Sequence, residues 1–187
     1  MIKKAFNLSE ILISIATIGI VAALIIPLIN FVNPHRDRIM YKKAAYSLTK
    51  AVSAVMETNS TVAGSSNGLK EIQGAGLCNA VCQQMNVLGS CNCASAGSYG
   101  TPNFKTLDGL RFWGLTASFT TDNTNGDYID VYVDYTLSKQ DKAARQQNKG
   151  NTNNDLRLRL RKTGKVGTES SGFTYENKLL NDQDSLE

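Results

Sequence analysis

The sequence is poor in the residues that most catalytic sites use. Among its 187 residues there is one histidine, His35, so histidine-based catalytic triads and multi-histidine metal sites are excluded. It also contains no glycine-rich phosphate loop, no G-x-S-x-G sequence and no H-E-x-x-H sequence. We therefore expect a protein that is not an enzyme, and the sequence indicates no cofactor.

The chain also lacks a large net charge. Its formal net charge is +4, and Lys3 and Lys4 in the first five residues supply two of these charges. A net positive charge this small gives no electrostatic reason to expect nucleic acid as a partner.

Charged residues are absent from Ile11 to Pro34. A helix over this run would be about 36 Å long, enough to cross a hydrocarbon core of about 30 Å. The run is longer than the core of an ordinary secretory signal, and no small-residue cleavage site follows it. We therefore expect a transmembrane helix that stays in the mature protein, with Lys3 and Lys4 favouring a cytoplasmic N-terminus.

The helix is expected to begin near Leu8 and to continue past the apolar run to about Glu57. Its first half is apolar all round, whereas its second half is amphipathic, with one apolar face formed by Tyr41, Ala45, Leu48, Val52 and Val55. Gly19 and Pro27 are weak points inside it. Pro27 removes a backbone donor and can kink the helix.

The remainder of the chain predicts strands separated by polar segments. Residues 59–68 have the composition of a linker, and residues 69–100 hold all four cysteines in a loop with one helical turn near Cys78–Met85. Residues 110–119 are a candidate strand. Residues 128–136 and 155–162 alternate strictly between apolar and charged or polar side chains, and they predict two strands that pair with each other.

These elements predict an α+β fold. A long N-terminal helix, membrane-spanning in its first half and amphipathic in its second, would pack on an antiparallel β-sheet. The apolar face that contains Tyr41, Leu48, Val52 and Val55 is the natural cover for the apolar face of the sheet.

The N-terminal segment resembles a known family. The run Ala5-Phe6-Asn7-Leu8-Ser9-Glu10, followed by an apolar span with Gly19 and Pro27, is similar to the start of bacterial type IV pilins and type II secretion pseudopilins. Ala5 stands where that family usually has Gly, and Asn7 stands where it usually has Thr. The resemblance covers about residues 1–50.

The resemblance implies a processing and assembly route. A prepilin peptidase would cut between Ala5 and Phe6, Phe6 would be N-methylated, Glu10 would be the assembly carboxylate, and Gly19 and Pro27 would mark the helix kink. Independently, an unpaired buried carboxylate is costly, so Glu10 is expected to neutralise the new Phe6 amine of a neighbouring subunit.

The domain organisation follows from this route. We expect a leader over residues 1–5, a transmembrane and assembly helix over 6–34, an amphipathic continuation over 35–58 and a pilin-like head with a β-sheet over 59–187. Before assembly the chain would be a single-pass protein of the inner membrane, and afterwards it would be part of an extracytoplasmic filament. Its partners would be other pilin or pseudopilin subunits, the peptidase that also methylates, and the inner membrane.

The four cysteines, Cys78, Cys82, Cys91 and Cys93, suggest disulfides in an extracytoplasmic domain. A bond between Cys91 and Cys93 is sterically poor. Two pairings therefore stay open, 78–91 with 82–93 and 78–93 with 82–91. A tetrathiolate zinc site is the alternative, although the 91/93 spacing does not fit the usual ligand pairs.

Residues 122–127 superficially resemble a calcium loop. Set on the EF-hand spacing with Gly126 sixth, the first and twelfth positions are Thr121 and Tyr132, which are not calcium ligands of that motif. Asp122 and Asp127 remain calcium candidates beside the interpretation of the segment as a polar turn.

The arginine row Arg157, Arg159 and Arg161 admits two interpretations. It could hold nucleic-acid phosphates, or it could form a solvated sheet face opposite Asp130 and Asp134. We favour the second interpretation.

Two hypotheses for function remain from the sequence. The first is a structural subunit of a type IV pilus or pseudopilus that polymerises through its N-terminal helix after leader cleavage and N-methylation. The second is a membrane-anchored extracytoplasmic binding module that does not polymerise.

Overall fold

The computed structural model describes residues 8–98, 101–123, 126–135, 156–168 and 174–180. For residues 8, 10, 24–37, 174, 175 and 178 this description covers the helical backbone only. Contacts divide the chain into two compact units, Met1–Asp37 and Arg38–Glu187. Each unit is considered by itself.

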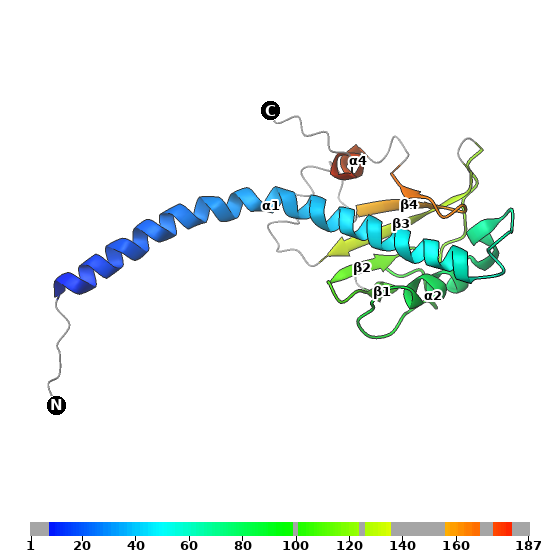
Figure 1. Ribbon diagram of the computed structural model, residues 1–187, viewed down its shortest axis with the longest axis horizontal. Coiled ribbons are helices and arrows are strands. Elements are labelled where there is room, and N and C mark those ends of the chain that lie inside the picture. The colour runs from blue at the N-terminus through cyan, green and yellow to red at the C-terminus, as the bar shows by residue number, and fades with distance from the viewer. Residues whose placement is uncertain (1–7, 99–100, 124–125, 136–155, 169–173, 181–187) are drawn as a thin grey trace. The chain divides into compact units, whose positions relative to one another are not determined.

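The first helix, α1, spans Leu8–Thr58 and contributes to both units (Figure 1). In the first unit, Ser9 and all residues from Ile11 to Ala23 have exposed side chains. This stretch of helix therefore has no buried side, whereas an ordinary surface helix buries one apolar side and exposes the other.

The predicted membrane-spanning first half of this helix is wrong. Among the described residues, no helix is both long enough and apolar enough to cross a membrane. This finding overturns the fold class as it was predicted, with its membrane-spanning helix. It also overturns the localisation as a single-pass inner-membrane protein.

The second unit is built on a five-stranded antiparallel sheet with the strand order β1-β2-β3-β4-β5. The strands are β1 (Phe104–Lys105), β2 (Leu110–Trp113), β3 (Tyr128–Tyr135), β4 (Leu156–Arg161) and β5 (Val166–Gly167). The two alternating segments form β3 and β4, as predicted, and they pair with Asp130 opposite Arg159 and Tyr132 opposite Arg157. The candidate strand over 110–119 is shorter than expected and ends at Trp113.

Short helices complete the second unit. They are the 3-10 helix η1 (Gly68–Ile72) and the α-helices α2 (Ala75–Gln83) and α4 (Thr174–Leu180). The single helical turn expected near Cys78–Met85 is thus a helix of nine residues that begins earlier.

The core of the second unit lies between the last part of α1 and one face of the sheet (Figure 1). Tyr41, Leu48, Val52 and Val55 are buried, as their helical spacing predicts. Ala45, which was expected on the same face, is only partly buried, and Ala44 and Ala51 are buried in addition. The sheet contributes the other half of the core through Leu110, Phe112, Ile129, Val131, Val133, Leu156, Leu158 and Leu160.

Backbone groups of β4 that β3 does not pair are satisfied by helices. The Tyr41 hydroxyl donates a hydrogen bond to the carbonyl oxygen of Arg157, and the carboxylate of Glu176 accepts one from the N–H of Arg157 at 3.3 Å. Burial raises the pKa of Tyr41, the nearby negative charge of Glu176 raises it further, and Arg157 opposes the shift. The phenol therefore stays protonated and keeps donating, which protects this stretch of strand edge from other strands.

Gly68 fixes the position of η1 against the end of β4. Its backbone has φ +54°, and a Cβ there would lie 2.3 Å from the carbonyl oxygen of Lys162, which accepts a hydrogen bond from Leu69. Gly64 also has a positive φ, +88°, but a Cβ there would meet nothing within 4 Å. A substitution at Gly64 therefore tests backbone strain alone, whereas a substitution at Gly68 tests backbone strain together with a steric clash.

We predict that Gly64→Ala lowers the free energy of unfolding by about 1–2 kcal/mol, the cost of a left-handed backbone for alanine. Gly68→Ala should lower it by roughly 1–3 kcal/mol more, because the methyl group displaces Lys162. Urea denaturation followed through Trp113 fluorescence measures both values. Equal losses in the two variants would contradict the close packing of η1 on β4.

Candidate functional site

The residues predicted for processing and assembly lie at the start of the chain. Ala5 and Phe6 fall outside the described residues, and Glu10 lies in α1 without a described side chain. Gly19 is exposed, and a Cβ built there meets nothing within 4 Å. Pro27 lies inside α1, which continues through it. The structure therefore leaves cleavage at Ala5, methylation at Phe6 and the assembly role of Glu10 as predictions.

The largest apolar surface among the described residues lies on this part of α1. Seven large apolar side chains there are between 44% and 68% exposed: Ile11, Leu12, Ile13, Ile15, Ile18, Ile20 and Val21. Complete burial of one such side chain is worth about 1.5–3 kcal/mol. A contiguous apolar surface of this kind is typical of a binding interface.

The cysteines form two disulfides, Cys78–Cys93 and Cys82–Cys91. This is one of the two pairings left open by the sequence, and it leaves no free thiolates for a zinc site. The bonds tie α2 to the loop that leads to β1. Closing a loop of about 15 residues contributes about 3 kcal/mol in the chain-entropy account.

The two calcium candidates each face a basic side chain. Asp127 forms an ion pair with Lys70 at 2.8 Å, and Asp122 lies 3.8 Å from the guanidinium of Arg161. Within the part of the chain that the structure describes, no group of three or more acidic, histidine or cysteine side chains could hold a metal. The calcium interpretation therefore gains no support, and the carbonyl oxygen of Asp122 accepts a hydrogen bond from the N–H of Gly126 at 2.9 Å, before β3 begins.

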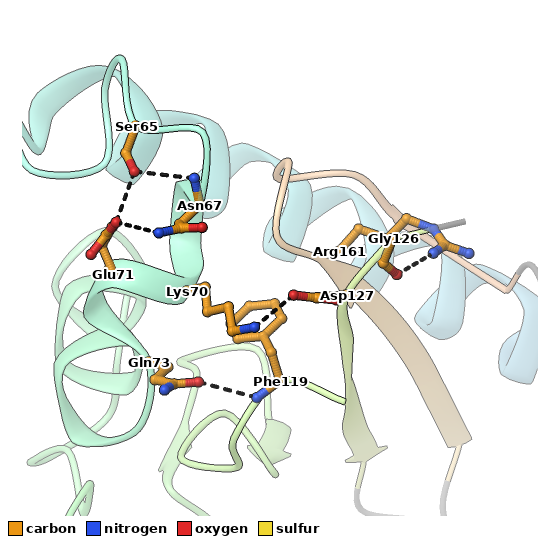
Figure 2. Close-up of polar contacts among 9 residues, drawn as sticks. All are labelled: Ser65, Asn67, Lys70, Glu71, Gln73, Phe119, Gly126, Asp127 and Arg161. Carbon is orange, nitrogen blue, oxygen red and sulfur yellow. Dashed lines mark hydrogen bonds and ion pairs between the residues drawn. The ribbon is translucent and has the colours of Figure 1, made fainter. Parts of the chain in front are cut away.

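Figure 2 shows the polar contacts that fasten the segment before α2 to the sheet. Lys70 reaches Asp127 at the start of β3, and the side-chain oxygen of Gln73 accepts a hydrogen bond from the N–H of Phe119 at 3.3 Å. The hydrogen bond from Lys70 is the main reason that the pKa of Asp127 is lowered. These contacts position the loop over 116–120, which borders the groove described below.

Glu71 anchors the turn before η1. Its carboxylate accepts hydrogen bonds from the Asn67 amide at 2.8 Å and from the Ser65 hydroxyl at 2.9 Å. The bond from Asn67 and then the bond from Ser65 lower the pKa of Glu71. This carboxylate therefore stabilises the local fold.

The arginine row differs from the solvated face that we expected. Arg159 and Arg161 are buried. Arg159 pairs with Asp130 at 3.1 Å and lies over the Tyr128 ring, 3.5 Å from its centroid, whereas Arg161 donates to the carbonyl oxygen of Gly126. Asp130 lies opposite Arg159 as predicted, whereas Asp134 lies opposite Arg111 of β2. Protein covers Arg159 and Arg161.

Sequence reasoning missed a groove of about 640 Å³ at the ends of β2 and β3. Its aromatic members are Trp113, Tyr128 and Tyr132, and its walls come from the loops around residues 96–98 and 117–120. The two tyrosines stand at alternate positions of the predicted strand over 128–136, which was the available signal. The loops that complete the groove carry no recognisable motif.

Comparison of the chain with protein-family models, with curated proteins and with solved structures finds no match. The function is therefore argued from the residues themselves.

We predict that the Lys70–Asp127 pair stabilises the protein in a pH-dependent way. Because the pKa of Asp127 is lowered in the folded state, this stabilisation is present above the unfolded pKa of about 3.9 and is lost as the pH falls through the folded pKa. Asp127→Asn should therefore destabilise the protein at pH 7 and should differ little from the unmodified chain in strong acid. Urea midpoints across this pH range measure the difference.

Asp108→Asn is the matched control, since Asp108 pairs with Lys43 across a more exposed contact. An Asp127→Asn variant with the same pH profile as the unmodified chain would show that the pair does not stabilise the fold.

Proposed function

We propose that this chain is a structural subunit of a filament of the type IV pilus or pseudopilus kind, which assembles through the N-terminal part of α1. The observation that carries the proposal is the exposed apolar surface from Ile11 to Val21. A helix that is apolar all round buries its surface in a larger assembly. Parallel copies of the same helix at the centre of a filament would provide that environment.

The small residues in this stretch suit helix–helix packing. Ser14, Thr17 and Gly19 lie among the isoleucines, and the Thr17 hydroxyl donates to the carbonyl oxygen of Ser14 at 2.9 Å. The Thr17 hydroxyl is thereby satisfied within its own helix. Because no other atom lies near the Cβ position of Gly19, a neighbouring helix has room to approach there.

The second unit supplies the head of the proposed subunit. It has its own core and two disulfides, so its fold does not need the apolar surface of residues 11–21. Such a division allows the N-terminal helix to exchange partners during assembly while the head keeps its structure. We assign the chain a structural role and no catalytic one.

Glu10 and the amine of Phe6 would set the register between subunits. Cleavage after Ala5 creates a cationic amine close to apolar side chains, and Glu10 lies about one helical turn further on. A buried charge without its partner costs several kcal/mol, so pairing between neighbouring subunits would select one axial offset. N-methylation of Phe6 would leave that charge in place.

The alternative is a binding module that does not polymerise, which the groove near Trp113 favours. Sequencing of the mature N-terminus separates the two proposals. A chain that begins at methylated Phe6 supports the filament subunit, whereas an intact Met1 supports the module.

We predict that Ile15→Asp abolishes filaments, because a carboxylate replaces a side chain that is 62% exposed in the monomer and buried in the assembly. Leu107→Asp, which changes a side chain that is 65% exposed in the turn between β1 and β2, should leave filaments intact. Electron microscopy and sedimentation measure assembly, and thermal unfolding of the head checks the fold. Normal filaments from Ile15→Asp would refute assembly through this surface.

We also predict that Glu10→Ala and Glu10→Gln prevent assembly, while Glu57→Ala at the exposed end of α1 does not. The loss should be at least tenfold in filament number, because one unpaired buried amine costs several kcal/mol per contact. Mass spectrometry of the mature N-terminus shows whether cleavage after Ala5 still occurs. Filaments of normal number from Glu10→Gln would exclude charge pairing as the cause of assembly.

A further inference from the structure

The groove at the ends of β2 and β3 lies on the face of the sheet that α1 does not cover. Side chains alternate along β3, so Ile129 and Val131 enter the core whereas Tyr128, Asp130 and Tyr132 point to the other face. Trp113 of the neighbouring strand β2 is paired with Tyr132, and its side chain lies on the same face of the sheet. The groove is therefore built from rigid strand positions.

Aromatic rings form the floor of the groove. The rings of Trp113 and Tyr132 are stacked, with centroids 5.9 Å apart and planes 10° from parallel. Tyr128 lies four residues before Tyr132 on the same face of β3, and the guanidinium of Arg159 lies over its ring. Neither tyrosine hydroxyl has a hydrogen bond to another residue within the described chain, so both are available to a ligand.

The walls are made of small residues and are fixed by close contacts. The N–H of Gly114 donates to the carbonyl oxygen of Ala96 at 3.1 Å, and a Cβ at Gly97 would lie only 2.9 Å from the Cβ of Trp113. A Cβ at Gly114 would lie 2.6 Å from the carbonyl oxygen of Asp130. Glycine at these two positions thus lets the loop approach the floor, and it preforms the groove.

The groove is close to electrically neutral. Asp130 is the one charged residue among its described lining residues, and one of its carboxylate oxygens is paired with Arg159. The other carboxylate oxygen makes no hydrogen bond to the described residues and can accept one from a ligand. An anionic ligand would find no cation in the described lining, and a cationic ligand would compete with Arg159 for both Asp130 and Tyr128.

We propose that this groove binds a neutral sugar residue of a glycan. A sugar ring offers an apolar C–H face that packs on aromatic rings and a set of hydroxyls that need acceptors and donors. The groove supplies both, through the tyrosine rings on one hand and through Asp130, the tyrosine hydroxyls and Ser118 on the other. Its volume of about 640 Å³ suits one or two sugar residues.

This inference does not rest on filament assembly. The groove belongs entirely to the second unit, whereas the proposed assembly surface belongs to the first. A chain that fails to polymerise could still bind sugar, and a filament could form from chains that do not.

Trp113 is the only tryptophan of the chain, so its fluorescence reports directly on the groove. The full chain, kept in solution by a detergent without sugar groups, is titrated with cellobiose, lactose and N,N′-diacetylchitobiose. We expect a saturable fluorescence change with at least one of these neutral disaccharides. No saturable change at roughly tens of millimolar sugar, or saturation by glucose 6-phosphate or choline alone, would overturn the proposal.

Variants connect the signal to the groove. Tyr132→Ala should weaken binding about tenfold by removing the stacked ring, and Tyr132→Phe should weaken it less because only the hydroxyl is lost. Ser118→Leu should block the groove from an exposed wall position without changing thermal stability, and it leaves Trp113 as the only tryptophan. Tyr46→Ala, at an exposed tyrosine of α1 outside the groove, is the control and should bind normally. Unchanged affinity in the stably folded Ser118→Leu variant would overturn the proposal.

Discussion

The packing of the last part of α1 against one face of the sheet is the interaction on which the second unit depends. Tyr41, Leu48, Val52 and Val55 meet a sheet face of leucine, isoleucine and valine side chains, and all of these residues are at most 2% exposed. Each large-to-small change in such a core typically costs 2–5 kcal/mol. Because the helix packs on the apolar face of the sheet, the alternating polar side chains of β3 and β4 lie on the other face.

On that other face Arg159 is buried and pairs with Asp130, which is partly buried. Asp130 and Arg159 face each other across β3 and β4, and the guanidinium of Arg159 also covers Tyr128. Breaking one partner of a buried pair costs more than the pair itself contributes, since a charge is left without its partner. The pair between Asp130 and Arg159 therefore favours the observed register of β3 and β4, and Arg159 holds the ring of Tyr128 at the groove.

The sequence could predict the parts of the fold that follow a simple period. Strict alternation identified β3 and β4 and their pairing, and helical spacing identified most of the buried face of α1. The two-residue strands β1 and β5 are too short to show any period, and they form only because neighbouring strands supply hydrogen bonds. The membrane span was inferred from apolar composition alone, and the described helices do not provide it. Cysteine spacing reduced the pairings to two, and only the position of α2 selects between them.

The groove could not be predicted for a different reason, which also bears on its use. Its members come from three places in the sequence, around residues 96–98, 113–120 and 128–132, and glycines with positive φ at 97 and 114 bring them together. Local sequence carries no signal for such a meeting, because each segment satisfies its own backbone in an ordinary loop or strand. The arrangement nevertheless costs conformational freedom at two glycines. The close approach of these loops to the sheet is therefore the feature on which the proposed sugar site depends.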